Sequence, residues 1–295
     1  IDSAYDGTKI HRPLFAEAAL DLATRVNNPK CLAKVYTWYG NSAHNNGKLE
    51  EALRWHEKAL HLRDSARLTE EAIGSCNNIG TNLKNQEYYK DALSYYRKGL
   101  KYVPKNTLSE NITSIHNNMG ATFRYLSEPD SAYFYLICGL KGSYQLGNQN
   151  NVAKAQLNIG VFLQEDRQQY YAAKDSLEKA IKYFREKGDS KYVSKCLLNL
   201  GSNYLLRGSV DSALHLYREL IQPENGLIKS DSALALKNIG QALLAKGSYD
   251  SALPYLEKAK ALFIEMNQSL QIQAVHISIQ QCAYGKLQRQ RLFLI

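Results

Sequence analysis

The sequence of 295 residues has no long apolar run. Its purely apolar stretches are a few residues long, as in LFLI at 292–295, whereas a helix that crosses a bilayer needs about 20 apolar residues. We therefore expect a soluble chain that makes no membrane contact within this segment. The sequence begins at Ile1 with no basic and apolar leader ahead of it, and we interpret it as a processed chain or an excised fragment.

The patterns that hold metals or carry out catalysis are also missing. The five cysteines show no C-x-x-C spacing and their number is odd, which disfavours a disulfide framework or zinc site and favours small buried residues. The seven histidines form no pair at the i, i+3 or i, i+4 spacing of metal ligands. No G-x-G-x-x-G, G-x-x-x-x-G-K-[ST], H-E-x-x-H or G-x-S-x-G motif occurs. We therefore expect no metal, no cofactor and no enzymatic activity.

The excess of positive charge has no single focus. The formal charge is +9, with the basic residues spread through the chain, and only KLQRQR at 286–291 is locally basic, which is typical of a solvated face. Helical-repeat proteins that read single strands place aromatic or Arg stacking groups in every repeat. On the helix face considered below, only Trp38, Arg124 and Tyr125 fit that role. We therefore expect no nucleic-acid partner.

What the chain does have is a repeat of asparagine, an apolar residue and glycine. Its copies are NNIG at 77–80, NNMG at 117–120, LNIG at 157–160, LNLG at 198–201 and KNIG at 237–240, with TWYG at 37–40 as a degenerate first copy. The period is 40 residues, with one slip of a single position. Self-similarity at such a period indicates a stacked array of helical units.

Each copy predicts two helices. Residues four before, one before and three after each glycine are mostly apolar, and with the glycine they form one face of a first helix. An alanine stands twelve residues beyond the glycine, or thirteen in the fourth copy, which has one inserted residue. Small residues recur seven residues after this alanine. This spacing predicts a second helix that approaches the first closely. The residues just before the glycines, which we expect to be buried, are Tyr39, Ile79, Met119, Ile159, Leu200 and Ile239.

The segments between the two helices of a copy are rich in turn residues, as in NNGK and KGSYD. Asp130, Asp211 and Asp250 lie in or beside the first turn of the second helix, where a carboxylate meets free N–H groups and the positive end of the dipole. Each copy is therefore predicted to be a helical hairpin.

The order apolar-Gly, aromatic or apolar, Ala, aromatic, Ala resembles the tetratricopeptide repeat, and the match covers residues 30–265. The resemblance implies an all-α, right-handed superhelical solenoid of antiparallel helix pairs. The family period is usually 34 residues, and the proline that usually follows the second helix appears here only as Pro104, with Pro223 nearby in the fifth copy. Without that stop the second helix can run longer, which suits a longer period.

We expect a single solenoid over residues 1–295. Residues 1–29 would form a partial N-terminal repeat, because 12–26 fall where a second helix belongs. Residues 30–265 would form six hairpins, and 266–295 a C-terminal capping helix, since a terminal repeat needs a changed outer face.

The asparagine two residues before each glycine points about 200° away from it, off the buried stripe. Stacking would turn these asparagines into a ladder along one side of the array, and a carboxamide can both donate to and accept from the backbone of an extended peptide. In similar tetratricopeptide proteins this side lines a concave groove, where such asparagines hold a bound peptide. The alternative is that each Asn bonds to the neighbouring repeat and fixes the stacking angle.

The same face carries six basic residues against one acid, Glu165. The basic residues are Lys34, Lys84, Arg124, Lys154, Lys195 and Lys237. A basic groove would prefer an acidic or carboxylate-bearing segment as its partner, and the alternative is an ordinary solvated face.

One well-known variant of the family clamps a C-terminal carboxylate, and this clamp is not expected here. Asn41 and Asn78 fit two of its places, but Thr37, Ser114 and Asn118 occupy the basic ones. The predicted peptide-binding residues are Asn41, Asn78, Lys84, Asn118, Arg124, Lys154, Asn158, Lys195, Asn199, Lys237 and Asn238.

The leading hypothesis is a non-enzymatic scaffold that holds a protein or peptide segment in this groove. The period and the DSA phrases at 130, 211 and 250 look like the repeat arrays of bacterial sensor-regulators, where the array is an input module often followed by a membrane span and an effector domain. Such a fragment would be periplasmic; otherwise we expect a cytoplasmic protein. The alternatives are a structural adaptor or oligomerisation module without a peptide groove and, third, an enzyme or a single-stranded nucleic-acid binder.

Overall fold

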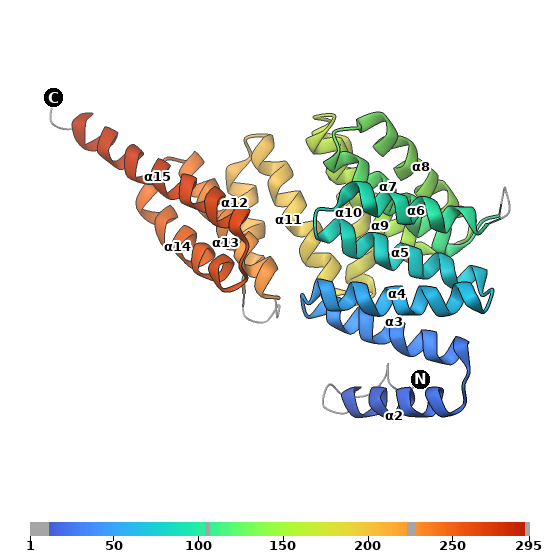
Figure 1. Ribbon diagram of the computed structural model, residues 1–295. Coiled ribbons are helices and arrows are strands. Elements are labelled where there is room, and N and C mark those ends of the chain that lie inside the picture. Colours follow the sequence, from blue (N-terminus) through green and yellow to red (C-terminus); the bar gives the residue numbers. More distant parts are fainter. Residues whose placement is uncertain (1–11, 104–106, 223–227, 293–295) are drawn as a thin grey trace. The chain divides into compact units, whose positions relative to one another are not determined.

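The computed structural model describes residues 12–103, 107–222 and 228–292, which form fourteen helices and no strand (Figure 1). Their bounds are α2 Arg12–Arg25, α3 Pro29–Asn45, α4 Leu49–Ser65, α5 Thr69–Asn85, α6 Tyr89–Lys101, α7 Glu110–Tyr125, α8 Pro129–Gln145, α9 Gln149–Glu165, α10 Tyr170–Glu186, α11 Ser190–Leu206, α12 Val210–Leu220, α13 Lys229–Ala245, α14 Tyr249–Glu265 and α15 Ser269–Leu292.

The helices pack in consecutive antiparallel pairs, as the repeat predicts. We call the first helix of each pair the A helix and the second the B helix; the pairs are α3/α4, α5/α6, α7/α8, α9/α10, α11/α12 and α13/α14. The predicted all-α solenoid of helical hairpins is therefore confirmed. Helix α2 precedes the first pair and α15 follows the last, where the sequence predicts a partial repeat and a capping helix.

The chain divides into two compact units, residues up to Ala155 and residues from Gln156 on, with the boundary inside α9. Within each unit, helices that are neighbours in the sequence pack together. Successive A helices also meet, α5 with α7 in the first unit and α13 with both α11 and α15 in the second. A single solenoid over residues 1–295 stays a prediction.

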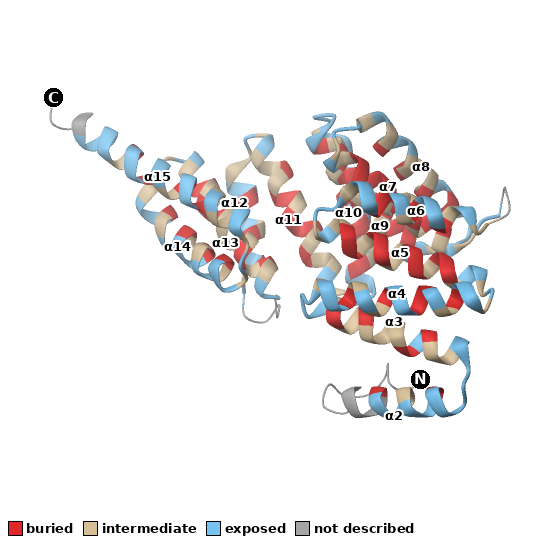
Figure 2. Cartoon of the chain, in the orientation of Figure 1, coloured by how far each residue is buried: buried red, intermediate tan, exposed pale blue. Residues whose placement is uncertain are grey.

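The glycine of each copy is explained by the B helix that crosses it. A Cβ on Gly80 would lie 2.4 Å from Cε1 of Tyr96 on α6, and one on Gly240 would lie 2.5 Å from the side chain of Leu256 on α14. Both of these large side chains are completely buried. The alanines twelve residues beyond the glycines are also completely buried, which gives the facing sides of each pair their buried stripes (Figure 2). The small residues are therefore required by the close approach of two helices.

The residue just before the glycine is buried in five of the six copies, as predicted. The prediction is wrong for Tyr39, which is half-buried. Its ring stacks on Trp55 of α4 with the centroids 5.0 Å apart, so the apolar body of the side chain is covered. The phenol ring leaves a polar end that prefers water.

The length of the B helices follows the prolines. Helices α4, α8, α10 and α14 have 17 residues each. Helix α6, with 13 residues, ends shortly before Pro104, and α12, with 11 residues, ends shortly before Pro223. Proline cannot donate the helical hydrogen bond and disfavours a helical residue ahead of it. The expected link between the missing prolines and longer B helices is confirmed.

Two of the three aspartates of the DSA phrases pair with a lysine from the next part of the array. Asp130, Asp211 and Asp250 lie in the first turn of their helices, as predicted. Asp211 pairs with Lys246, the residue directly after α13, at 2.6 Å, and Asp250 pairs with Lys286 on α15 at 2.5 Å. The carboxylates therefore stabilise both a helix start and the contact with the next repeat.

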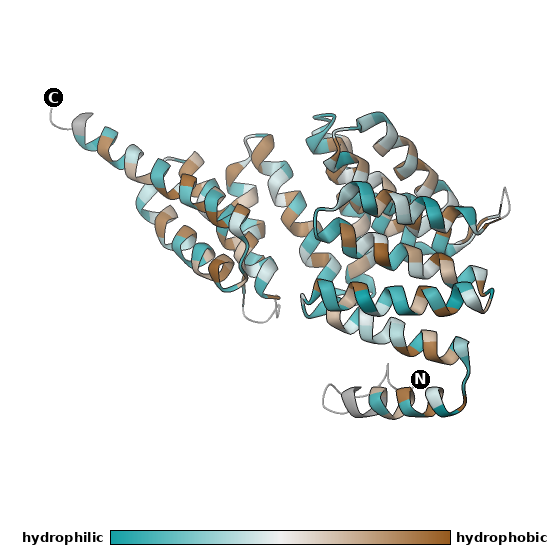
Figure 3. Cartoon of the chain, in the orientation of Figure 1, coloured by the Kyte–Doolittle hydropathy of each residue, from teal (hydrophilic) through white to brown (hydrophobic). Residues whose placement is uncertain are grey.

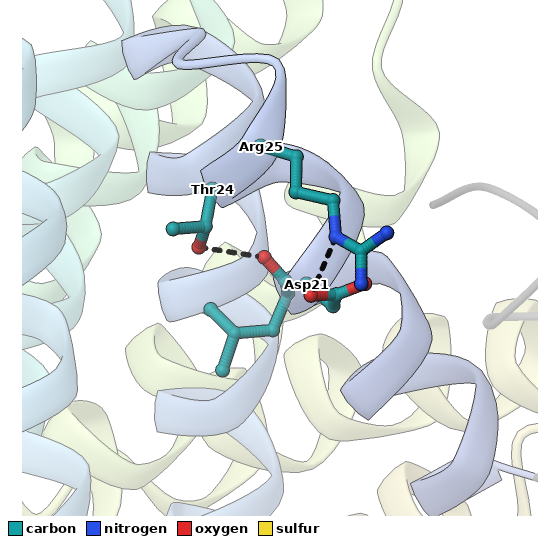
Figure 4. Close-up of polar contacts among 4 residues, drawn as sticks. Asp21, Thr24 and Arg25 are labelled. Carbon is teal, nitrogen blue, oxygen red and sulfur yellow. Dashed lines mark hydrogen bonds and ion pairs between the residues drawn. The ribbon is translucent and has the colours of Figure 1, made fainter.

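Helix α2 begins the described chain. Ala16 and Ala23 are buried, and Arg25 pairs with Asp21 one turn earlier, with Nε 3.0 Å from Oδ1 (Figure 4). The hydroxyl of Thr24 donates to the carbonyl of Leu20 at 2.8 Å (Figure 4). These bonds lie within one helix, so they support the helix itself rather than its packing.

The structure bears on two further predictions, that the chain has no membrane-spanning helix and that its cysteines are small buried residues. No described helix combines the length and the apolar character that a membrane span requires. The five cysteines are free thiols, of which Cys76, Cys196 and Cys282 are buried, as expected, while Cys31 and Cys138 are partly exposed.

Candidate functional site

All eleven predicted peptide-binding residues lie on A helices, and all are half-buried. In the first unit they are Asn41 on α3, Asn78 and Lys84 on α5, Asn118 and Arg124 on α7, and Lys154 on α9; in the second they are Asn158 on α9, Lys195 and Asn199 on α11, and Lys237 and Asn238 on α13. We describe the two groups separately.

In the first unit, direct bonds join the A helices that carry the predicted residues. His44 on α3 and Asn85 on α5 are hydrogen-bonded at 3.2 Å, and Lys30 on α3 pairs with Glu71 on α5 at 2.7 Å. We call the surface shared by α3, α5 and α7 the first polar face. It consists of Trp38, Asn41, His44, Asn77, Asn78, Thr81, Lys84, Asn85, Asn118 and Arg124.

The asparagines of the first polar face differ in what they bond. Asn118 donates from Nδ2 to Oδ1 of Asn77 at 2.8 Å and to Oγ1 of Thr81 at 3.2 Å, and both acceptors belong to α5. For Asn118, the structure therefore favours the reading in which the amide fixes the stacking of two repeats. Within residues 12–103, 107–222 and 228–292, the side chains of Asn41 and Asn78 make no hydrogen bond. Their amides are available to a ligand.

In the second unit, Asn199 and Asn238 are bonded within the unit, whereas the side chain of Asn158 makes no hydrogen bond among the described residues. Asn199 donates to the carbonyl of Lys195 on its own helix at 2.8 Å, and Asn238 bonds to the hydroxyl of Tyr217 on α12. Lys237 donates to Oε1 of Gln271 on α15 at 3.1 Å. We call Lys195, Asn199, Lys237 and Asn238 the second polar face. Three of these side chains bond to groups on helices α11, α12 and α15 of the same unit.

The lysines of the second polar face are desolvated. Burial lowers the pKa of Lys195, an effect that neighbouring Lys191 increases and Asp231 opposes, and burial also lowers the pKa of Lys237. Asp231 on α13 is only 5% exposed, and its Oδ2 has no hydrogen-bond partner in the described part of the chain. Burial raises the pKa of Asp231, against the pull of Lys195. The charges of Lys195 on α11 and Asp231 on α13 therefore influence each other across the two helices.

Asp231 is not among the residues predicted from the sequence, because it lies at a different helix position from them. Asp231 lies nine residues before Gly240, and side chains at this register reach the preceding A helix in the first unit as well. The bonds are Glu71 to Lys30 at 2.7 Å, Asn111 to Glu70 at 3.1 Å and Asn151 to Thr113 at 3.3 Å. An amide or carboxylate nine residues before the glycine in four of the six copies was the available signal for this connecting position.

Among the described residues, no group of three or more His, Cys, Asp or Glu side chains could hold a metal ion. Most side chains of the two polar faces carry amides, ammonium groups or a guanidinium, beside the indole of Trp38, the imidazole of His44 and the hydroxyl of Thr81. Amides and cationic groups can form hydrogen bonds and ion pairs with a bound chain.

Comparisons with known proteins identify the repeats. Two tetratricopeptide repeat models match, one over residues 73–106 and one over residues 198–265. No curated protein matches the chain. The chain is similar in fold to BtubC from P. vanneervenii (18% identity, TM-score 0.57); the match covers 74% of this chain and 92% of BtubC.

The fold is also similar to those of two Rap proteins. One is a Rap protein complexed with Competence and Sporulation Factor (13% identity, TM-score 0.64); the match covers 88% of this chain and 76% of the Rap protein. The other is the apo form of RapI (13% identity, TM-score 0.56); the match covers 96% of this chain and 93% of RapI. At these identities the likeness concerns the fold alone.

Proposed function

We propose that this chain binds an extended peptide segment on its first polar face. The chain is a tetratricopeptide repeat protein. The scaffold of this usually non-enzymatic family is typical of protein–protein interaction. On the first polar face, A helices present amides and charged groups side by side. The partner we propose is a segment of another protein that carries acidic residues.

The observation that carries the proposal is the state of Asn41 and Asn78. Both amides are half-buried on neighbouring A helices, and neither side chain makes a hydrogen bond within the described residues. A half-buried amide without a partner loses part of its hydration and regains nothing. The N–H and C=O groups of an extended peptide would satisfy both amides, whatever the side chains of that peptide.

Two amides provide too little free energy to hold a peptide by themselves. If each contributes a net ~1 kcal/mol, their sum stays below the roughly 4–15 kcal/mol that association costs in lost freedom. Side-chain contacts must supply the remainder. Trp38 offers an aromatic surface beside Asn41. The formal charge of +9 favours an acidic partner, which is why we propose an acidic segment.

We further propose that the array is the interaction module of a bacterial regulatory protein. The support is the fold shared with Rap proteins, one of which was crystallised with Competence and Sporulation Factor. The competing function is a structural adaptor without a peptide site. The bonds of Asn118, Asn199 and Asn238 to their own array favour it, so the test must separate the two sets of asparagines.

The test is a binding screen with immobilised extended peptides of graded acidity. Acidic peptides should bind, and replacing both Asn41 and Asn78 by Ala should weaken their binding about tenfold or more, because two backbone bonds are lost. Asn150→Ala, which removes an exposed amide elsewhere on the first unit, is the matched control. Equal binding by the double variant and the wild type, or no binding of any peptide, would reject the proposal in favour of the adaptor.

A further inference from the structure

The last helix of the second unit, α15, has two different sides. Its inner side packs on α13 and α14. Val275, Ser278 and Cys282 are buried, and a Cβ on Gly285 would lie 2.3 Å from the ring of Tyr249 on α14. The inner side therefore fixes α15 to the array, while the opposite side is exposed along the helix.

The outer side of α15 carries large apolar residues at a regular spacing. Leu270, Ile277 and Tyr284 lie seven residues apart and are each more than half exposed, and the exposed Leu287 follows three residues after Tyr284. Figure 3 shows hydrophobic residues recurring along α15 between hydrophilic ones. A spacing of seven is typical of a helix that packs lengthwise against another helix. We call Leu270, Ile277, Tyr284 and Leu287 the outer stripe.

Three residues of the outer stripe occupy positions at which A helices contact the next A-type helix. Counted from the glycine of each copy, these positions are ten before, three before and four after it, and on α15 Gln280 takes the place of the glycine. At these positions the earlier helices form the bonds Glu70 to Asn111 at 3.1 Å, Asn77 to Asn118 at 2.8 Å, His44 to Asn85 at 3.2 Å and Lys237 to Gln271 at 3.1 Å. The outer stripe therefore continues the contact between successive A helices, which predicts that a helix covers it.

The charges of the chain indicate the source of that helix. From Ser269 to Gln288 the exposed residues of α15 include no Asp, Glu, Lys or Arg, whereas those of α14 include Glu257, Lys258 and Glu265. An acidic or basic partner would find no opposite charge on this side. Two copies of a chain with a formal charge of +9 repel each other, and this uncharged side lets them meet without placing like charges together. It therefore suits a second copy of the chain.

We propose that the outer stripes of two copies of this chain pack against each other in an isologous dimer with antiparallel α15 helices. Ile277 lies midway between Leu270 and Tyr284. In this arrangement it faces Ile277 of the second copy, and Leu270 faces Tyr284 of the second copy. The direction follows from the basic segment KLQRQR at 286–291, because a parallel pair would place the two segments side by side and an antiparallel pair separates them.

The dimer should be weak, and it should form independently of the peptide site. The outer stripe spans fewer than three heptads, and one pair of helices of this length buries less than the ~1,200 Å² of a stable standard interface. The dimer should therefore dissociate on dilution. The outer stripe belongs to the second unit and the proposed peptide site to the first, so neither proposal depends on the other.

The first test is sedimentation equilibrium over a wide range of protein concentration. The wild type should show a reversible monomer–dimer equilibrium, and Ile277→Glu should weaken the dimer about tenfold or more, because two like charges would meet at the centre of the contact. The matched control is Ile264→Glu on α14, since Ile264 is 52% exposed and Ile277 is 55% exposed; this variant should dimerise like the wild type.

Three outcomes of this test would overturn the proposal. A wild type that stays monomeric throughout would leave the outer stripe to a helix of another protein. A dimer that survives Ile277→Glu, or one that Ile264→Glu weakens equally, would show that the copies meet through another surface.

The second test uses cysteine cross-linking to establish the direction of the helices. When Leu270→Cys and Tyr284→Cys variants are mixed and mildly oxidised, residue 270 of one copy should link to residue 284 of the other, as identified by peptide mass spectrometry. Each variant alone should link to itself about tenfold less, because an antiparallel pair places its two new thiols at opposite ends. Leu22→Cys, at an exposed position of α2, mixed with Tyr284→Cys measures linkage by chance collision. Linkage of the first mixture no greater than that control, or self-linkage as strong as the mixed one, would contradict the antiparallel dimer.

The third test needs no substitution. The proposed contact contains no ion pair and the copies repel each other through their net charge, so added salt should strengthen the dimer about twofold or more. A dimer that salt weakens would be held by charged groups elsewhere on the chain, and pairing through the outer stripe would be wrong.

Discussion

Asn118 on α7 donates a hydrogen bond from its side-chain nitrogen to Oδ1 of Asn77 on α5, over 2.8 Å. Asn78, which has the same position relative to its glycine as Asn118, makes no side-chain hydrogen bond in the part of the chain that the structure describes. Two asparagines of one sequence pattern therefore differ in role. Asn118 joins two repeats, and Asn78 is left for a ligand.

This difference predicts opposite effects on stability. Asn118→Ala should lower the free energy of unfolding by about 1–2 kcal/mol, because it leaves the partly buried Asn77 without its donor. Asn78→Ala should change stability by less than about 0.5 kcal/mol, since alanine is also the better helix former. Urea unfolding followed by circular dichroism would measure both. An equal loss in the two variants would mean that Asn78 also serves packing.

The glycine at the helix crossing predicts a second pair of substitutions. Gly80→Ala should destabilise the protein by about 1–3 kcal/mol, because the new methyl group would lie 2.4 Å from the buried ring of Tyr96. Gly74→Ala on the same helix is the control, since the nearest atom to its Cβ would be 3.4 Å away, on the side chain of Asn111. Gly74→Ala should be neutral or stabilising by up to about 1 kcal/mol. Thermal unfolding of both variants would decide.

Much of the fold follows from the sequence because each hairpin repeats one packing solution. Gly80 and Ala92 lie at fixed positions, and both are small because α5 and α6 touch there. The roles of the asparagines could not be predicted in the same way. Whether the Asn118 amide meets Asn77 or solvent depends on how α7 is rotated against α5, a relation between residues 41 apart in sequence.

Other features of the candidate surfaces were present in the sequence but not sampled. Asp231 is not on the helix face whose charged residues the sequence pattern singles out, so the pattern does not predict its electrostatic interaction with Lys195. On α8, Phe134 and Ile137 occupy positions that are charged or polar in most of the other copies. The register of a repeat is therefore informative on every face of its helices, including those away from the conspicuous glycines.

The buried His56 predicts a pH dependence of stability. Burial, with smaller contributions from the charges of His44 and Arg63, lowers the pKa of His56 from 6.5 to about 4. The unfolded chain therefore binds a proton first as pH falls, and stability should fall from about pH 6.5 down to about pH 4, by up to ~3 kcal/mol. Burial also lowers the pKa of His116, so part of the dependence belongs to that residue.

Replacing His56 by Leu should remove its share of the pH dependence. Leu occupies the corresponding place in three other copies, at Leu136, Leu177 and Leu256, so the packing should be kept. The Nδ1 atom of His56 has no hydrogen-bond partner among the described residues, so the variant should also gain about 1 kcal/mol at pH 7. His61→Leu, at an exposed position of the same helix, is the control. An unchanged pH profile for His56→Leu would contradict the assignment.

The pKa shifts of Asp231 and Lys195 predict that their charged forms lower the free energy of unfolding of the second unit. Burial raises the pKa of Asp231 and lowers that of Lys195, so desolvation exceeds their mutual attraction and both ionised groups destabilise the fold near neutral pH. Because the folded pKa of Asp231 is raised, its unfavourable contribution appears as pH rises above the unfolded value of about 3.9. The contribution of Asp231 therefore has the opposite pH dependence to that of His56.

Replacing Asp231 by Asn and Lys195 by Met together should raise the free energy of unfolding at pH 7 by about 1 kcal/mol or more. Each single variant should be less stable than the double one, because each leaves one buried charge without its partner. Unfolding measured at pH 3 and pH 7 would isolate the contribution of Asp231, which appears only above the unfolded value of about 3.9. If the double variant is less stable than the wild type at both values, the pair stabilises α11 against α13 after all, and its desolvation is outweighed by an attraction stronger than its shifted pKa values imply.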